Sequence, residues 1–64
     1  MTRAPFTAAE KLKAIQRELE WRRVVYPGRV SEGKMSAHES AWQIQIFEAI
    51  ALDYARAAQQ ERLL

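Results

Sequence analysis

The chain has 64 residues, of which 48% are hydrophobic, and it contains no cysteine. A chain this short forms one domain at most and seldom builds a self-sufficient core, so such domains rely on disulfides, a metal or association with other chains. The missing cysteines exclude disulfides and thiolate metal sites, and His38, the one histidine, cannot form a metal cluster alone. We therefore expect self-association, with no metal and no cofactor.

The net charge of +2 is mild but unevenly distributed. Residues 1–34 hold eight Lys and Arg against four Glu, a balance of +4, whereas residues 35–64 hold two Arg against four acidic residues, a balance of −2. This asymmetry fits either an anion-binding half or two halves that attract in an antiparallel pair. No apolar run approaches the ~20 residues that span a bilayer, and no apolar leader is present, so we expect a cytoplasmic protein without membrane contact.

The first predicted helix covers about residues 7–25. Thr7 and Glu10 have the spacing of a capping box, in which each side chain accepts a hydrogen bond from the other residue's amide. Strong helix formers follow. Apolar residues spaced by three and four define one face of this helix: Leu12, Ile15 and Leu19.

The connection is predicted to be an ordered elbow over residues 26–35. Pro27 is expected to end the first helix near residue 25, because proline removes a helical hydrogen bond and disfavours helical backbone in the residue before it. Gly33 can supply the left-handed residue that closes a turn. A compact, fixed turn is therefore expected rather than a long mobile loop.

The second predicted helix covers about residues 36–63 and begins at Ser36 and Glu39, which repeat the capping-box spacing. Two adjacent apolar stripes follow, and together they are wider than a single neighbouring helix can cover. One stripe should face the first helix: Ile44, Phe47, Ala51, Tyr54 and Ala58. The other stripe consists of Ile46, Ile50, Ala57 and Leu64 and should contact a further surface, most simply a second copy. The predicted interface consists of Trp42, Ile46, Ile50 and Ala57.

These elements predict an all-α fold with a single domain over residues 1–64. The domain is a helical hairpin of two antiparallel helices joined by the elbow. It is expected to assemble into a homo-oligomeric helical bundle, since a hairpin alone leaves the second stripe uncovered.

No catalytic motif is present, and we do not expect an enzyme. The chain has no histidine pair and no Gly-rich phosphate loop, and Glu18 and Glu20 fall on different faces of a helix, so they do not form an acid–base pair. Nucleic acid is also disfavoured as a partner, because the elbow is longer than a helix-turn-helix turn and the second helix is acidic.

The elbow concentrates an aromatic and several basic side chains. Tyr26 offers a ring on which a base could stack, and four residues offer donors to phosphate: Arg22, Arg23, Arg29 and Lys34. This combination suits a small phosphorylated nucleotide. The same residues equally fit a structural role, with Tyr26 at the end of the bundle and the cations paired with nearby glutamates. Trp21 and Trp42, which flank the elbow, fit either ligand stacking or packing against each other or against a partner chain.

Much of the chain resembles a group of short, mostly uncharacterised proteins encoded by proteobacterial phages and prophages. The shared pattern consists of paired arginines, Val-Tyr-Pro, a Val three residues past the Pro, a Gly–basic–Met–Ser run and a later Ala-Ile-Ala-x-Asp-Tyr. Here its positions are Arg22, Arg23, Val25, Tyr26, Pro27, Val30, Gly33, Lys34, Met35, Ser36, Ala49, Ile50, Ala51, Asp53 and Tyr54. The resemblance covers about residues 8–55 and implies a phage protein in the cytoplasm of a bacterial host.

In size, helicity and lack of cysteine the chain is also similar to phage sponge proteins of the anti-CBASS type. Those proteins are helical oligomers that sequester cyclic nucleotides with a stacking tyrosine and basic residues. The likeness implies stacking on Tyr26 and phosphate contacts from Arg22, Arg23, Arg29 and Lys34. It thus implies a non-catalytic anti-defence role, the capture of a phosphorylated nucleotide immune signal. The alternatives are a module that docks its second helix on a host or phage protein, and a weak nucleic-acid binder.

Overall fold

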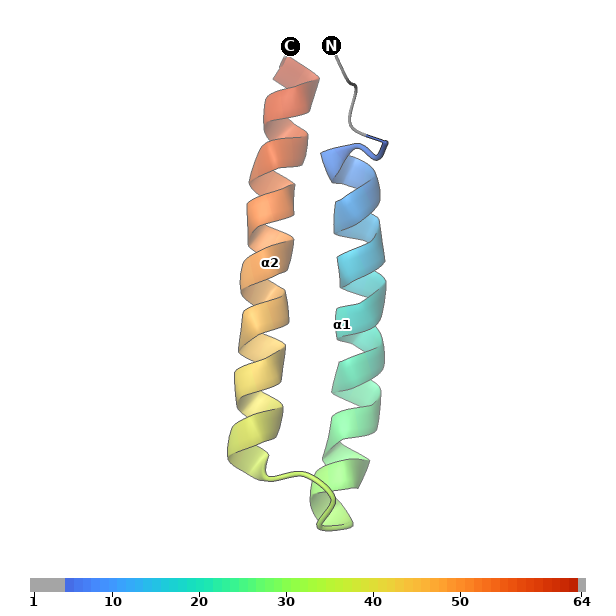
Figure 1. Ribbon diagram of the computed structural model, residues 1–64, viewed down its shortest axis with the longest axis vertical. Coiled ribbons are helices and arrows are strands. Elements are labelled where there is room, and N and C mark those ends of the chain that lie inside the picture. The colour runs from blue at the N-terminus through green and yellow to red at the C-terminus, as the bar shows by residue number, and fades with distance from the viewer. Residues whose placement is uncertain (1–4, 64) are drawn as a thin grey trace.

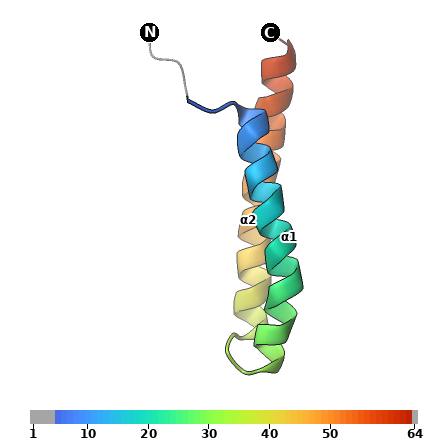
Figure 2. The ribbon, with the colours of Figure 1, turned by 90° about the vertical axis from the view of Figure 1, so that its right-hand side faces the viewer.

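The computed structural model describes residues 5–63, which form two long antiparallel helices (Figure 1). Helix α1 spans Ala8–Ser31 and helix α2 spans Ala37–Leu63. The predicted helical hairpin is therefore confirmed for this part of the chain, in which no strand occurs. Residues 1–4 and 64, the ends of the predicted domain, lie outside the described residues. The molecule is a rod of 49 × 18 × 17 Å, and Figure 2 shows its helices crossing at a shallow angle.

The start of α1 is held by two separate sets of hydrogen bonds. The predicted capping box is present: the Thr7 amide donates to Glu10 Oε1 at 2.9 Å, and the Glu10 amide donates to Thr7 Oγ1 at 3.1 Å. In addition, the Ala8 amide donates to both carboxylate oxygens of Glu61 at 3.1 Å. A carboxylate at a helix N-terminus is favourable because the helix dipole is positive there. Glu61 thus links the last turns of α2 to the first turn of α1.

Helix α1 continues through Pro27 to Ser31, so the prediction that it ends near residue 25 is wrong. The fixed φ of proline is compatible with helix, and its cost is one lost hydrogen bond and a clash with the preceding turn. The added turn lets Tyr26 and Val30 lie against α2, where Tyr26 is buried and Val30 half-buried. Burial of these side chains offsets the cost of Pro27. The elbow is correspondingly shorter and covers residues 32–36 rather than 26–35.

Gly33 closes the end of α1 as predicted. Its φ is +74°, the left-handed region that glycine enters without steric cost. The Gly33 amide donates to the Val30 carbonyl at 3.1 Å, and the Lys34 amide donates to the Arg29 carbonyl at 2.9 Å. This pair of bonds is a Schellman motif, which satisfies carbonyls that a helix end leaves open. Helix α2 begins at Ala37 and is capped by Ser36, whose Oγ accepts from the Glu39 amide at 2.9 Å.

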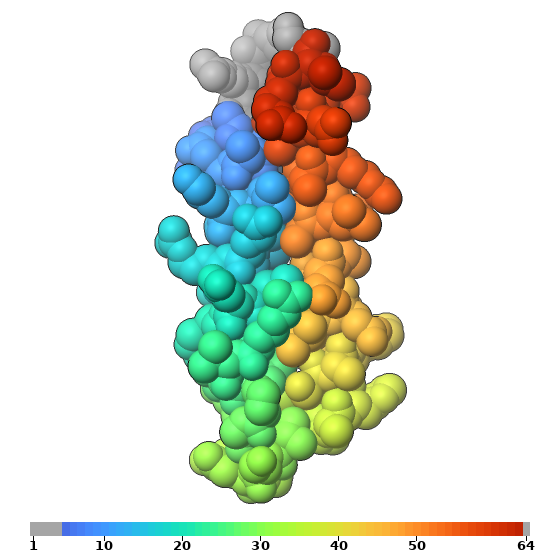
Figure 3. Space-filling model, turned by 180° about the vertical axis from the view of Figure 1, so that it is seen from behind, coloured from blue at the N-terminus to red at the C-terminus, as the bar shows by residue number. Residues whose placement is uncertain are grey.

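The core between the helices is small. Ala8, Leu19 and Tyr26 are the buried residues of α1, and α2 buries none of its residues. The predicted inner stripe of α2 is half-buried against α1: Ile44, Phe47, Ala51, Tyr54 and Ala58. Figure 3 shows the side chains of the two helices in contact along the rod. Neither of the two helices is long and apolar enough to cross a membrane.

Candidate functional site

Tyr26, the predicted stacking residue, lies on the inner face of α1 and is only 6% exposed. It follows Leu19 by seven residues, two helical turns, and so continues the stripe that packs against α2. This position results from the continuation of the helix through Pro27. A base cannot stack on a ring so enclosed. Tyr26 therefore has the second of its two expected roles, a structural one.

Arg22, a predicted phosphate ligand, is turned toward the helix pair. Its side chain is 22% exposed, Nη1 donates to Glu18 Oε2, and the guanidinium lies 4.0 Å from the centre of the Phe47 ring. Burial lowers the pKa of Arg22, but hydrogen bonding to Glu18 and Tyr26 outweighs burial, so the pKa is raised above its ordinary value. Arg22 is therefore a permanently charged cation that covers Phe47, paired with Glu18 through Nη1 while its buried Nε has no hydrogen-bond partner.

Two further predicted phosphate ligands form ion pairs with glutamates. Arg23 Nη2 lies 2.7 Å from Glu48 Oε2 and links the two helices, and Lys34 Nζ lies 3.0 Å from Glu32 Oε2 within the elbow. Each of these side chains is about half exposed or more. Exposed pairs of this kind contribute at most about 1 kcal/mol, so an anion could still displace Glu32 from Lys34.

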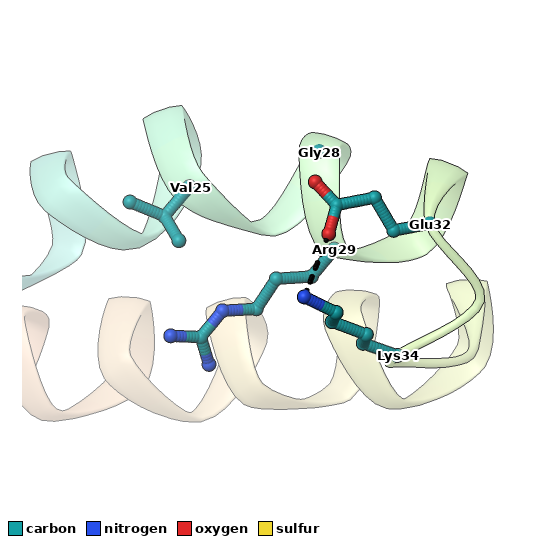
Figure 4. Close-up of a pocket in the computed structure, with 5 residues that line it drawn as sticks. All are labelled: Val25, Gly28, Arg29, Glu32 and Lys34. Atoms are coloured by element: carbon teal, nitrogen blue, oxygen red, sulfur yellow. Dashed lines mark ion pairs between the residues drawn. The ribbon is translucent and has the colours of Figure 1, made fainter.

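Arg29 and Lys34 are the two predicted ligands that share a hollow. The hollow has a volume of about 380 Å³ and is lined by Val25, Gly28, Arg29, Glu32 and Lys34. Figure 4 shows the Arg29 guanidinium pointing away from the Lys34–Glu32 pair and forming no ion pair with the residues drawn. Two cations and one carboxylate leave this hollow with a balance of +1, a modest attraction for an anion.

Trp21 lies beside this cluster and is 51% exposed. The guanidinium of Arg29 is 5.8 Å, and that of Arg22 5.9 Å, from the centre of its ring. Both distances fit cation–π contacts. Trp21 and Arg29 are eight positions apart, about two helical turns, so this spacing places them near each other only when α1 continues past residue 25.

The predicted interface residues of α2 lie mainly on the outside of the hairpin. Trp42 is 56% exposed and Ile46 is 36% exposed, Ala57 is exposed, and Ile50 is half-buried. Trp21 and Trp42 are both more than half exposed, so neither is enclosed within the hairpin. The side chains of this stripe remain available to another surface.

Residues 5–63 contain no cluster of three or more His, Asp or Glu that could hold a metal ion. Comparison of the chain with protein-family models, with curated proteins and with solved structures finds no match.

Proposed function

We propose that this chain is a non-catalytic binding module that works as a homo-oligomer, in which copies associate through the exposed apolar stripe of α2. One observation carries the proposal: α2 has 27 residues and none of them is buried within the hairpin. Its outer stripe nevertheless includes Trp42, Ile46 and Ile50. Contiguous exposed apolar surface of this kind marks a site of protein association.

A second copy suits this stripe better than an unrelated partner, for two reasons. With three buried residues among residues 5–63, the hairpin gains little stability from its own core, and association is the usual remedy for so small a chain. The two halves of the chain also carry opposite charge, +4 for residues 1–34 and −2 for residues 35–64. Copies can therefore attract each other when α1 of one meets α2 of the other.

The proposal is tested by measuring the solution mass, for example by sedimentation equilibrium. The wild type is expected at a multiple of 7.4 kDa. Ile46→Glu places a charge in the stripe and is expected to give monomers that keep their helical circular dichroism. Leu52→Glu is the matched control, because Leu52 is also exposed on α2 but lies on the opposite side of the helix from Ile46 and Ile50.

Assembly that survives Ile46→Glu would contradict the proposed interface. A monomeric wild type would contradict self-association altogether. That second result would favour docking of α2 on a different host or phage protein, since the stripe would then lack any partner of its own kind.

A second candidate function is the capture of a small phosphorylated nucleotide at the elbow, as the similarity to phage sponge proteins implies. It is favoured by the shared hollow of Arg29 and Lys34 and by the exposed ring of Trp21, 5.8 Å from Arg29. In this version Trp21 replaces the buried Tyr26 as the stacking surface.

Thermal shift against a panel of cyclic dinucleotides and trinucleotides tests this candidate. A shift that is lost in Arg29→Ala and in Trp21→Ala, but kept in Arg56→Ala, would support it, because Arg56 is an exposed cation of α2 outside the hollow. A panel without any shift would count against it.

A further inference from the structure

One side of the hairpin carries both tryptophans, and we call it the tryptophan face. Its members are Trp21 and Val25 of α1 and Trp42, Ile46 and Ile50 of α2. The contact of Arg22 with the Phe47 ring, at 4.0 Å, marks this side of the helix pair. The Arg23–Glu48 ion pair marks the opposite side.

Helix geometry assigns these members to the same side. The Trp21 ring lies within contact distance of Arg22 and Arg29, at 5.9 and 5.8 Å, so it belongs to the side of α1 that carries Arg22. On α2 each residue turns by about 100°, so the positions of Ile46 and Ile50 both turn away from Phe47 in the direction opposite to Glu48. The apolar residues of both helices therefore form one surface.

The contacts between the helices also fix their register. Arg22 meets Phe47, Arg23 meets Glu48, and the start of α1 meets Glu61. Because the helices are antiparallel, Trp21 lies level with the turn between Ile46 and Ile50. By the same register Arg29, near the end of α1, lies level with the first turn of α2, which carries Glu39.

We infer that two copies join tryptophan face to tryptophan face about a twofold axis parallel to the helices, with both elbows at the same end. This inference rests on the self-association proposed above. In this arrangement α1 of each copy packs on α2 of the other, and Trp21 meets Ile46 and Ile50 of the second copy. Arg29 then faces Glu39 of the second copy, and symmetry provides this ion pair twice.

The distribution of charge favours this arrangement over a dimer whose twofold axis is perpendicular to the helices. Along the tryptophan face α1 presents Lys11, Arg17, Arg22 and Arg29 against Glu10 and Glu18, a balance of +2, whereas α2 presents Glu39, Asp53 and Glu61 against Arg56, a balance of −2. An axis perpendicular to the helices would bury the same apolar surface but would place α1 on α1 and α2 on α2. Like charges would then oppose each other on both sides of the interface, which is unfavourable.

Charge reversal with mixing tests the arrangement, with the dimer dissociation constant as the readout. Arg29→Glu and Glu39→Lys should each weaken their own dimer by about tenfold, because two attractive pairs become repulsive. An equimolar mixture of the two variants should form heterodimers of near wild-type affinity. In such a heterodimer the introduced glutamate of one copy faces the introduced lysine of the other, and the remaining Arg29 faces the remaining Glu39. An ion pair within one copy could not be restored by mixing.

The control mixture combines Arg62→Glu with Glu20→Lys, which make the same changes of charge at exposed positions off the tryptophan face. Arg62 follows Glu48, which lies on the opposite side, by fourteen residues, about four helical turns. This pair should dimerise like the wild type alone and gain nothing on mixing. A dimeric wild type whose Arg29→Glu and Glu39→Lys variants are not restored by mixing would overturn the arrangement but not self-association, and an equal gain in the control would do the same. A monomeric wild type would overturn both proposals.

Discussion

At the scale of single residues, the surroundings of each side chain decide its role. Tyr26, Arg22, Arg29 and Lys34 were all predicted to contact a ligand, yet Tyr26 is buried and Arg22 is half-buried beside Phe47. Arg29 and Lys34 stay at the surface of the hollow. A tyrosine near an arginine in the sequence is compatible with ligand binding and with helix packing. The face of the helix on which each residue lies decides which of these two roles it has.

Tyr26 is expected to matter for stability. Tyr26→Ala removes one of the few buried side chains and should lower the free energy of unfolding by about 3–5 kcal/mol. Tyr26→Phe keeps the ring and should cost only about 0.5–1.5 kcal/mol through loss of the hydroxyl. Urea unfolding followed by circular dichroism measures both values. An unchanged unfolding free energy for Tyr26→Ala would show that the ring is not part of the core.

Glu10 makes the start of α1 sensitive to acid. Hydrogen bonding to the amide and the side chain of Thr7 holds the pKa of Glu10 below its usual value near 4.5. A carboxyl whose pKa is lowered on folding stabilises the folded state above its unfolded pKa, and this contribution is lost as the pH falls through the folded pKa. The melting temperature should therefore fall more steeply below about pH 4.5 in the wild type than in Glu10→Gln. Parallel curves for the two proteins would contradict this role.

At the scale of the elements, hydrogen bonds at the helix ends fix where each helix starts and stops. Thr7 and Ser36 cap the two N-termini, and Gly33 closes α1 through a Schellman motif. These local bonds were predictable from short sequence patterns. The passage of α1 through Pro27 was not, because the local penalty of proline is opposed by the burial of Tyr26 against a distant helix.

The two glycines should respond in opposite directions to alanine. At Gly33, with φ at +74°, an added Cβ is strained, so Gly33→Ala should destabilise the hairpin by about 1–2 kcal/mol. At Gly28, inside α1, an added Cβ meets no atom within 4 Å, so Gly28→Ala should stabilise by about 0.5–1 kcal/mol. Thermal unfolding of both variants checks the signs. A stabilising Gly33→Ala would contradict the left-handed conformation.

At the scale of the whole molecule, the hairpin is a narrow rod with a small core and an uncovered apolar face. Ala8, Leu19 and Tyr26 are its buried residues within the described range of 5–63. Two helices can bury only the stripe where they meet, so a second stripe on either helix stays exposed in a single copy. The properties of the rod in solution should therefore depend on what covers that stripe.

Association should make stability depend on protein concentration. When assembly stabilises the folded hairpin, mass action raises the melting temperature as concentration increases. We expect this rise for the wild type and for Leu52→Glu, and a lower, concentration-independent melting temperature for Ile46→Glu. Scanning calorimetry over a wide concentration range measures the trend. A wild-type melting temperature that does not change with concentration would contradict association coupled to folding.

The sequence by itself determined the helices, their N-terminal caps, the Gly33 turn and the two apolar stripes of α2, because each depends on neighbours within one or two helical turns. Only the tertiary structure decided the true end of α1, the burial of Tyr26, the contact of Arg22 with Phe47 and the hydrogen bonds from the Ala8 amide to Glu61. These features depend on the register between two helices, and register is set by packing between residues that are far apart in the chain. Short sequence patterns do not specify that packing.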